Sequence, residues 1–227
     1  MKHIRSFHPN SDISPLMWND GIGDGFNYAG MVRIRTIADG SCYFHAIANG
    51  YYIPYRTGVS KTGQSVNRQE IVRSLRRDLA VKLGSRVNPT DATSPRNYDL
   101  LGRGQVSTFA KDALMDEYSL ENMQNVLDSS TSVDHSFHEF VSNQLNKDIY
   151  MLDREKQDVY VLGDDDDLYY KKRPSLVLLY QPGHFELVGI RGDDGHIMTY
   201  FHPEDPFILV IRQRLQHLRA LGSKRKP

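Results

Sequence analysis

The sequence predicts an α+β fold in which helices pack around a small, mainly antiparallel central sheet. Two patterns in the 227 residues lead to this class. Stretches with apolar residues at helical spacing dominate the first two thirds of the chain. Short segments rich in β-branched and aromatic residues, separated by polar or glycine-bearing turns, fill the last third. The chain shows no repeat and no clear linker, so we expect one main domain.

The expected domain organisation follows the changes in composition along the chain. Residues 1–30 mix polar residues with Gly, Pro and Asp and are predicted to form an N-terminal arm. Residues 31–221 form the single domain, with a helical insert around 56–130, and 222–227 is a basic tail. The run GIGDG at 21–25 is assigned to the arm, because a dinucleotide-binding loop would need a convincing helix after it.

Helical periodicity predicts a series of helices before the sheet. Apolar positions recur at helical spacing from Tyr43, after a loosely alternating stretch at 31–38. The next helix, 67–84, has an N-cap candidate in Asn67, and Glu70 would complete a capping box. Shorter helices are expected at 106–117, 119–128 and 132–146.

The last third is predicted to form strands linked by hairpins. The segments with strand character are 148–153, 159–163, 174–181, 184–190 and 196–201. SLVLLY is apolar throughout, which predicts a central strand covered on both faces. The segment 206–221 is expected to begin extended and to end as a helix. The run DDDD at 164–167 is interpreted as a solvated turn, since calcium loops space their ligands differently.

Composition argues against several classes of function. Twenty-eight Lys and Arg balance 28 Asp and Glu, so the formal net charge is zero and no nucleic-acid partner is indicated. No run reaches the roughly 18 apolar residues of a membrane span, and the N-terminus lacks a signal-peptide core. One cysteine allows no internal disulfide and no Cys-x-x-Cys zinc site. These points favour a reducing, cytosol-like compartment, although a protein injected or released into a host cell would have the same composition. No membrane or metal partner is expected, and the chain is separately expected to be a monomer.

The single cysteine, Cys42, lies in the stretch DGSCYFHAIANG. A predicted helix begins there, and the free N–H groups and partial positive charge of a helix start favour a thiolate. Asp39 or Ser41 could cap this helix, and Gly40 would permit a turn that points N–H groups at an oxyanion. Free cysteine is also among the most buried residue types, so a packing role for Cys42 stays open.

A nucleophilic cysteine needs a base, and the chain has nine histidines. His184 follows Gln-Pro-Gly and opens a predicted strand, which gives it a rigid mount beside an open edge. Glu186 lies two residues later on the same face, where it could accept the second N–H of the imidazole. Cys42, His184 and Glu186 are therefore the preferred constellation, with a structural interpretation of the same residues as the alternative.

At these residues the chain resembles the ovarian tumour (OTU) domain cysteine proteases. DGSCYFHAIA is similar to their nucleophile motif, Asp-Gly-x-Cys, and GHFELV is similar to their histidine motif. FHEFVSNQLNKDIYML is similar to the helix and strand that precede that histidine. The resemblance covers roughly 30–205, and the form Ser-Cys-Tyr-Phe-His-Ala suggests a viral or bacterial member.

The resemblance implies a papain-like fold and an activity. The expected reaction is hydrolysis of the bond after the C-terminal glycine of ubiquitin or of a ubiquitin-like modifier. The implied partner is ubiquitin or polyubiquitin, and no cofactor is implied. The insert around 56–130 has no close match, and its size suggests that it helps to contact ubiquitin.

The resemblance also assigns roles residue by residue. Cys42 matches the nucleophile and His184 the general base. The turn before the nucleophile, with its oxyanion loop, corresponds to Asp39, Gly40 and Ser41. Glu186 stands at the third-residue position, where Asp or Asn is commoner, and Asp39 serves that role in some members. Whether Asp39 or Glu186 orients the histidine stays open at this point.

Three other functions are weighed against this one. The same fold could serve as a non-catalytic ubiquitin-binding module, or an unrelated protein could bury Cys42 in its core. His-Phe-Glu at 184–186 also resembles the His-x-Glu of zinc deaminases, but those enzymes need a further cysteine pair that the chain lacks.

Overall fold

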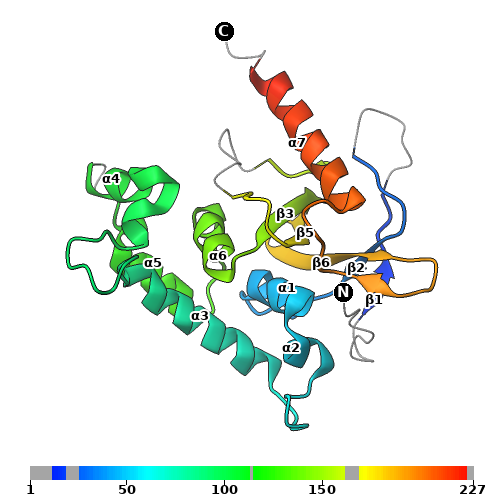
Figure 1. Cartoon of the computed structure of the whole chain (residues 1–227), viewed down its shortest axis with the longest axis horizontal. Coiled ribbons are helices and arrows are strands. Elements are labelled where there is room, and N and C mark those ends of the chain that lie inside the picture. Colours follow the sequence, from blue (N-terminus) through cyan, green and yellow to red (C-terminus); the bar gives the residue numbers. More distant parts are fainter. Residues whose placement is uncertain (1–11, 19–25, 113–114, 162–168, 224–227) are drawn as a thin grey trace.

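The computed structural model describes residues 12–18, 26–112, 115–161 and 169–223, and within them a seven-stranded sheet forms the centre (Figure 1). The strands are β1 (Ile13–Pro15), β2 (Met31–Ile34), β3 (Asp148–Asp153), β4 (Asp158–Val159), β5 (Ser175–Gln181), β6 (His184–Arg191) and β7 (Ile197–Met198). Their order is β1-β2-β6-β5-β3-β4, and β7 pairs with β6. Among these strands, β3 and β5 run parallel and the other pairs are antiparallel. The predicted α+β class is therefore confirmed.

Helices cover both faces of this sheet. The α-helices are α1 (Cys42–Tyr51), α2 (Ile53–Thr57), α3 (Arg68–Gly84), α4 (Gln105–Asp112), α5 (Leu120–Asp128), α6 (His138–Leu145) and α7 (Pro206–Ser223). Short 3₁₀ turns occur at Tyr98–Gly104, Asp116–Tyr118 and His135–Phe137. Figure 1 shows α1 against the sheet, α7 on the opposite side, and α3, α4 and α5 gathered in a lobe beyond α6. No helix within the described ranges is long and apolar enough to cross a membrane.

Strand β5 explains why the molecule has two hydrophobic cores. Successive side chains of a strand point to opposite faces. Leu176 and Leu178 are buried in the cluster that includes α1, α3 and α6, whereas Val177 and Leu179 are buried in the cluster that includes α7. The prediction that SLVLLY forms a central strand is confirmed, because β5 lies between β6 and β3.

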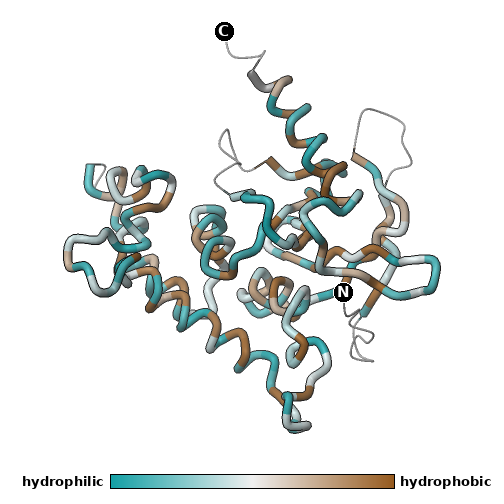
Figure 2. Tube along the Cα trace, viewed as in Figure 1, coloured by the Kyte–Doolittle hydropathy of each residue, from teal (hydrophilic) through white to brown (hydrophobic). Residues whose placement is uncertain are grey.

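Helix α7 corrects one expectation. The sequence predicted an extended start, but the segment is helical from Pro206 onward. The Asp205 side chain accepts a hydrogen bond from the N–H of Phe207 at 3.0 Å, and proline suits the first helical position because it needs no donor there. Figure 2 shows hydrophobic and hydrophilic residues alternating along this helix. Its buried residues, Phe207, Ile208, Ile211 and Leu215, follow helical spacing.

Helix α3 begins as predicted. The Asn67 side chain accepts hydrogen bonds from the N–H groups of Gln69 and Glu70, at 2.9 and 3.3 Å. The expected capping box is not completed, because the Glu70 carboxylate pairs with Arg73 one turn further on. Both side chains of the Glu70–Arg73 pair are exposed, and exposed ion pairs contribute little to stability.

The parallel pairing of β3 with β5 is a second correction, since hairpins were expected throughout. Asp148, fully buried at the start of β3, accepts hydrogen bonds from the N–H groups of Lys171 and Arg173 at 2.8 and 3.0 Å. Its carboxylate also accepts from Nε of Arg173 at 2.9 Å. These bonds hold the start of β5 beside the start of β3, so both strands leave from one end of the sheet. The run at 164–167 lies outside the described residues, as does GIGDG at 21–25.

Part of the expected N-terminal arm contributes to the sheet. Ile13 to Pro15 form β1, which pairs antiparallel with β2. Leu16, Trp18 and Phe26 are buried in the core that α7 covers. The division of the chain into arm, domain, insert and tail remains a prediction.

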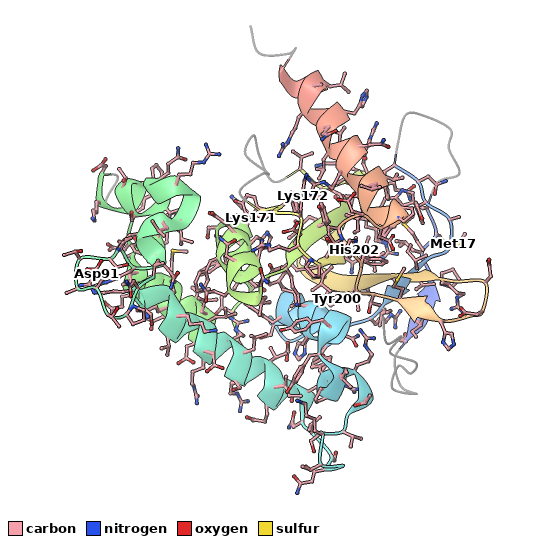
Figure 3. The ribbon with its side chains drawn as sticks, in the orientation of Figure 1. Met17, Asp91, Lys171, Lys172, Tyr200 and His202 are labelled. Atoms are coloured by element: carbon pink, nitrogen blue, oxygen red, sulfur yellow. The ribbon has the colours of Figure 1, made fainter. Side chains whose placement is uncertain are left out.

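Two positively charged side chains, Arg56 and Lys147, hold the C-terminal end of α1 in place. Buried Arg56 donates hydrogen bonds to the carbonyl oxygens of Asn49 and Gly50, at 3.1 and 2.5 Å, and so satisfies acceptors that a helix end leaves free. Nζ of Lys147 lies 4.5 Å from the ring centre of Tyr51 and 5.0 Å from that of Tyr200, which Figure 3 labels beside α1. With this end held, the N-terminal end of α1 is fixed in position as well.

We expect Asp148→Ala to lower the free energy of unfolding by about 3 kcal/mol, because it leaves a buried Arg173 guanidinium and two N–H groups without their acceptor. Urea unfolding followed by circular dichroism measures the change. Asp193→Ala, in the exposed turn between β6 and β7, is the control and should leave the midpoint unchanged. Equal midpoints for the two variants would contradict the role given to Asp148.

Candidate active site

A tight turn at residues 39–41 leads into α1. The N–H of Ser41 donates to Oδ1 of Asp39 at 3.0 Å, which closes the turn on its own first residue. Gly40 has φ of 77°, in the left-handed region that favours glycine, as the sequence predicted. A Cβ atom at this position would lie 2.1 Å from the carbonyl oxygen of Ser130. Glycine is therefore required here both by the backbone conformation and by the adjacent loop.

The other oxygen of Asp39 contacts His45, one turn into α1. Nε2 of the fully buried His45 lies 3.1 Å from Oδ2 of Asp39, and Nδ1 lies 2.7 Å from the hydroxyl of Tyr55. Burial would raise the pKa of Asp39, but the hydrogen bonds from His45 and from the Ser41 N–H hold it below its ordinary value. Burial lowers the pKa of His45, so the imidazole is neutral. It therefore donates from Nε2 to Asp39 and accepts from Tyr55.

Neither Asp39 nor Ser41 caps α1 through its side chain, which corrects the expectation. Ser41 is the N-cap residue but makes no side-chain cap bond. Its hydroxyl instead accepts a hydrogen bond from Nη1 of Arg76 at 2.8 Å. The first N–H groups of α1 thus have no side-chain cap, and they lie where the nucleophile of a cysteine hydrolase would need donors.

Cys42 is the first residue of α1, and only 4% of its surface is exposed. Burial raises the pKa of its thiol above the ordinary value. The backbone N–H groups of Phe185, of Tyr43 and of Cys42 itself act in the opposite direction. The resting thiol is therefore protonated, although these three N–H groups would favour negative charge on the sulfur.

His184 opens β6, and Glu186 lies on the same face, as the alternation of a strand predicted. Nε2 of His184 is 4.0 Å from Oε1 of Glu186, and Oε2 of that buried carboxylate is 3.5 Å from Nη1 of Arg33 on β2. The glutamate thus faces both a cation and the imidazole. This arrangement leaves Nδ1 of His184 as the nitrogen available to a nucleophile.

The structure brings the Cys42 and His184 segments together without joining the two side chains. The sulfur contacts the backbone of Phe185, the next residue after His184. Among the hydrogen bonds of the described residues, none links Sγ of Cys42 to the imidazole of His184. Catalytic hydrogen bonds are often long before substrate binds and tighten in the complex, so this geometry is compatible with a resting active site.

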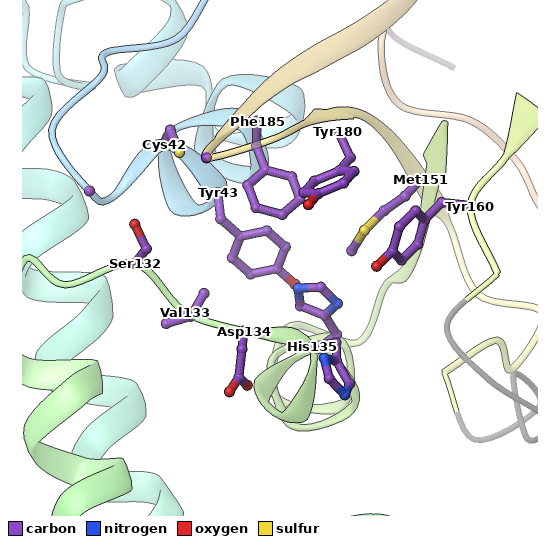
Figure 4. A pocket seen from close by; sticks show the side chains of 13 residues that line it. Cys42, Tyr43, Ser132, Val133, Asp134, His135, Met151, Tyr160, Tyr180 and Phe185 are labelled. Carbon is purple, nitrogen blue, oxygen red and sulfur yellow. The ribbon is translucent and has the colours of Figure 1, made fainter. Parts of the chain in front are cut away.

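A cavity of about 250 Å³ opens beside Cys42 (Figure 4). Its walls come from α1 and the turn before it, from α6 and the segment before it, from β3, from the residue after β4, and from the hairpin of β5 and β6. The aromatic residues that line it are Tyr43, Tyr160, Tyr180 and Phe185. His138, also in the lining, stacks on Tyr43 with ring centres 4.7 Å apart, and burial lowers its pKa to about 3. This histidine is neutral at physiological pH and cannot supply a cation to the site.

Sequence reasoning missed two residues that contact the turn before Cys42. His45 was not singled out among the nine histidines, because its partner Asp39 comes close only in the folded turn. Arg76 was overlooked on α3, although a signal was present: it falls on the apolar stripe between Val72 and Leu79, where an unpartnered charge would be costly. Within the described part of the chain, no group of three or more His, Cys, Asp or Glu residues could hold a metal ion.

The chain is similar in structure to several solved OTU domains. No family model matches the sequence, and no curated protein matches it. One similar structure is an OTU domain in complex with ubiquitin, at 15% identity and a TM-score of 0.47, covering 86% of this chain and 88% of that chain. Others are the viral OTU protease from Farallon virus (13%, 0.40, covering 70% and 84%) and an OTU deubiquitinase from Wolbachia pipientis wMel (14%, 0.38, covering 73% and 91%).

Gly40→Ala should displace the turn at residues 39–41, because its Cβ would overlap the carbonyl oxygen of Ser130. We expect it to lower the free energy of unfolding by about 3 kcal/mol, from backbone strain and overpacking together. Gly195→Ala is the matched control: its φ is 78°, but nothing lies within 4 Å of the added carbon. The control should cost only about 1 kcal/mol in urea unfolding. Equal losses would show that the Ser130 contact is unimportant.

The thiol of Cys42 should react with iodoacetamide only at high pH in the free protein. Because burial raises its pKa, the inflection of rate against pH should lie above the value of about 8.5 for free cysteine. The chain has one cysteine, so total labelling reports on Cys42 alone. The same chain in urea is the control and should inflect near the free value. An inflection below pH 7 would instead indicate an ion pair with His184 in the resting protein.

Proposed function

We propose that the protein is a cysteine-dependent deubiquitinase of the OTU type. The observation that carries this proposal is the setting of Cys42: a thiol at the start of α1, packed against the strand that begins with His184 and lining a cavity. The motifs DGSC and GHFE, which resemble those of OTU proteases, lie in these two segments. The reaction would be hydrolysis of the bond after the C-terminal glycine of ubiquitin or a ubiquitin-like modifier.

The proposed mechanism uses groups that the fold places around the cysteine. Substrate binding brings Nδ1 of His184 to the thiol, and the imidazole takes its proton. The thiolate attacks the glycine carbonyl, and the N–H groups at the start of α1 donate hydrogen bonds to the oxyanion. His184 then gives the proton to the departing amine, which leaves a thioester on Cys42. Water, deprotonated by His184, hydrolyses the thioester and restores the thiol.

Glu186 and Asp39 take different roles in this proposal. Glu186 is the carboxylate that faces His184, so it would accept the Nε2–H of the imidazole and stabilise the cation formed during reaction. Asp39 is occupied by the Ser41 N–H and by His45, which supports a role in shaping the oxyanion turn. The geometry therefore favours Glu186 over Asp39 as the third catalytic residue.

The proposed partner is ubiquitin or polyubiquitin, and the proposed compartment is the cytosol, where ubiquitin conjugates occur and thiols stay reduced. The chain is proposed to act as a monomer. One observation favours the alternative of a non-catalytic ubiquitin-binding module: the buried, protonated thiol of Cys42 has no bond to His184 in the resting structure.

Cleavage of di-ubiquitin by purified variants tests the proposal. Cys42→Ala should abolish turnover, and His184→Ala should lower it at least about 100-fold through loss of the general base. Glu186→Gln should have a smaller effect, about tenfold, because Glu186 lies 4.0 Å from Nε2 of His184 and an amide oxygen can still accept the imidazole N–H but carries no charge. The control is His196→Ala, in the exposed turn after β6, which should leave the rate unchanged.

A ubiquitin whose C-terminus carries an electrophile separates the alternatives. The proposed enzyme forms a covalent adduct at Cys42 that Cys42→Ala abolishes. A binding module would bind ubiquitin without forming the adduct. Turnover that persists in Cys42→Ala would refute the proposed mechanism.

A further inference from the structure

We propose that Arg76 of α3 is a positioning residue for the nucleophile, because its guanidinium fastens the turn before Cys42 to the helical lobe of α3 and α5. The catalytic part of this inference, that Arg76 positions a nucleophile, rests on the proposed function. The electrostatic effect of Arg76 on the thiol of Cys42 can be tested without ubiquitin.

Arg76 is almost completely buried, at 1% exposure, and makes four hydrogen bonds. Nε donates to the carbonyl oxygen of Leu127 at 2.9 Å. Nη2 donates to the carbonyl oxygens of Val126 and Thr131, at 2.6 and 2.7 Å. Nη1 donates to the hydroxyl of Ser41 at 2.8 Å. One side chain therefore joins the end of α5, the loop after it and the residue before the nucleophile.

The loop after α5 also contacts the turn directly, at Gly40. Thr131, which Arg76 holds through its carbonyl, follows Ser130, whose carbonyl oxygen leaves no room for a Cβ on Gly40. The turn is thus bounded by the loop at Gly40 and by the guanidinium at Ser41. If Arg76 released the loop, both restraints would be lost together.

A guanidinium fits this position better than an ammonium group. Cζ of Arg76 lies 4.7 Å from the ring centre of Phe44, on α1, so the planar head packs on an aromatic ring while its edges donate. Lysine would keep the positive charge, but its single nitrogen could not reach acceptors spread over α5, the loop and Ser41.

Arg76 also places a positive charge near Cys42. Burial lowers the pKa of Arg76 to about 10, so it stays charged at neutral pH. Three negative groups favour the charged form of Arg76: Asp39 of the turn, Asp128 at the end of α5, and the thiolate form of Cys42. Arg76 in turn disfavours the cationic form of His45. Because Coulomb attraction is mutual, the guanidinium favours the thiolate, so charge and clamp make separable contributions.

This arrangement gives part of the 56–130 segment a role beside the expected contact with ubiquitin. Helices α3 and α5 lie in that segment, and Arg76 connects them to the turn at residues 39–41. A movement of the lobe, such as one caused by substrate binding, would be passed to the nucleophile through this side chain.

The clamp is tested by Ser41→Ala, which removes the one bond to the turn and leaves the three bonds from Arg76 to carbonyl oxygens. We expect the kcat for di-ubiquitin cleavage to fall about tenfold with KM within about twofold, because the loss misplaces reacting groups without altering the ubiquitin surface. Arg77→Met is the control, since this neighbour on α3 is exposed, and should change neither constant. An unchanged kcat in Ser41→Ala would overturn the clamp.

The charge is tested by alkylation of Cys42, which needs no ubiquitin. Arg76→Met should move the inflection of the alkylation rate against pH upward, by on the order of 0.5 pH unit. Arg76→Lys should restore the wild-type inflection, because it keeps the charge, whereas its kcat for di-ubiquitin cleavage should stay below the wild-type value. A residue with only a structural role would not show this split. An inflection unmoved in Arg76→Met, in protein that is folded by circular dichroism, would overturn the inference, as would full recovery of kcat in Arg76→Lys.

Failure of the proposed function and failure of the inference about Arg76 would give different results. If wild-type protein neither cleaves di-ubiquitin nor labels with the ubiquitin probe, the proposed function fails, and the alkylation profiles still decide whether Arg76 acts on Cys42. If wild-type protein is active and the Ser41 and Arg76 variants match it, the inference alone fails. Should Arg76→Met not fold, Ser41→Ala and Arg76→Lys carry the decision.

Discussion

Gly40 lies so close to the carbonyl oxygen of Ser130 that no side chain could stand between them. This contact sets the path of the turn before Cys42, and with it the direction of the first N–H groups of α1. The other restraints on the turn act around it: Asp39 binds the Ser41 N–H and His45 from within. A short turn held at each residue keeps backbone donors in place, which a site that stabilises negative charge requires.

The electrostatics of the cysteine reflect two opposing effects. Removing the thiol from water favours its protonated form, whereas the N–H groups of Cys42, Tyr43 and Phe185 favour the thiolate. Burial prevails in the resting protein, so proton transfer to His184 would have to accompany substrate binding. A buried thiol that is activated only in the complex is also protected from alkylation and oxidation, which follow thiolate character and exposure.

The sheet determines where His184, the proposed base, is held. β6 lies between β2 and β5 and pairs with both, so His184 starts from a strand that cannot shift easily. The hairpin before it turns at Gly183, whose φ is 75°. Asp148 contributes indirectly, because it holds β5 parallel to β3 and thereby places the strand on which β6 aligns. The position of His184 therefore depends on contacts well away from the cysteine.

Local patterns in the sequence determined the α+β class, the start of α1 at the cysteine, the central strand and the shared face of His184 and Glu186. These features follow from periods of 3.6 and 2 residues, which a chain carries whatever its neighbours are. Only the tertiary structure decided the parallel pairing of β3 with β5, the pairing of Asp39 with His45 and the clamp at Arg76. Each of these depends on which distant groups share a buried space, because a buried polar group takes whichever partner packing brings to it.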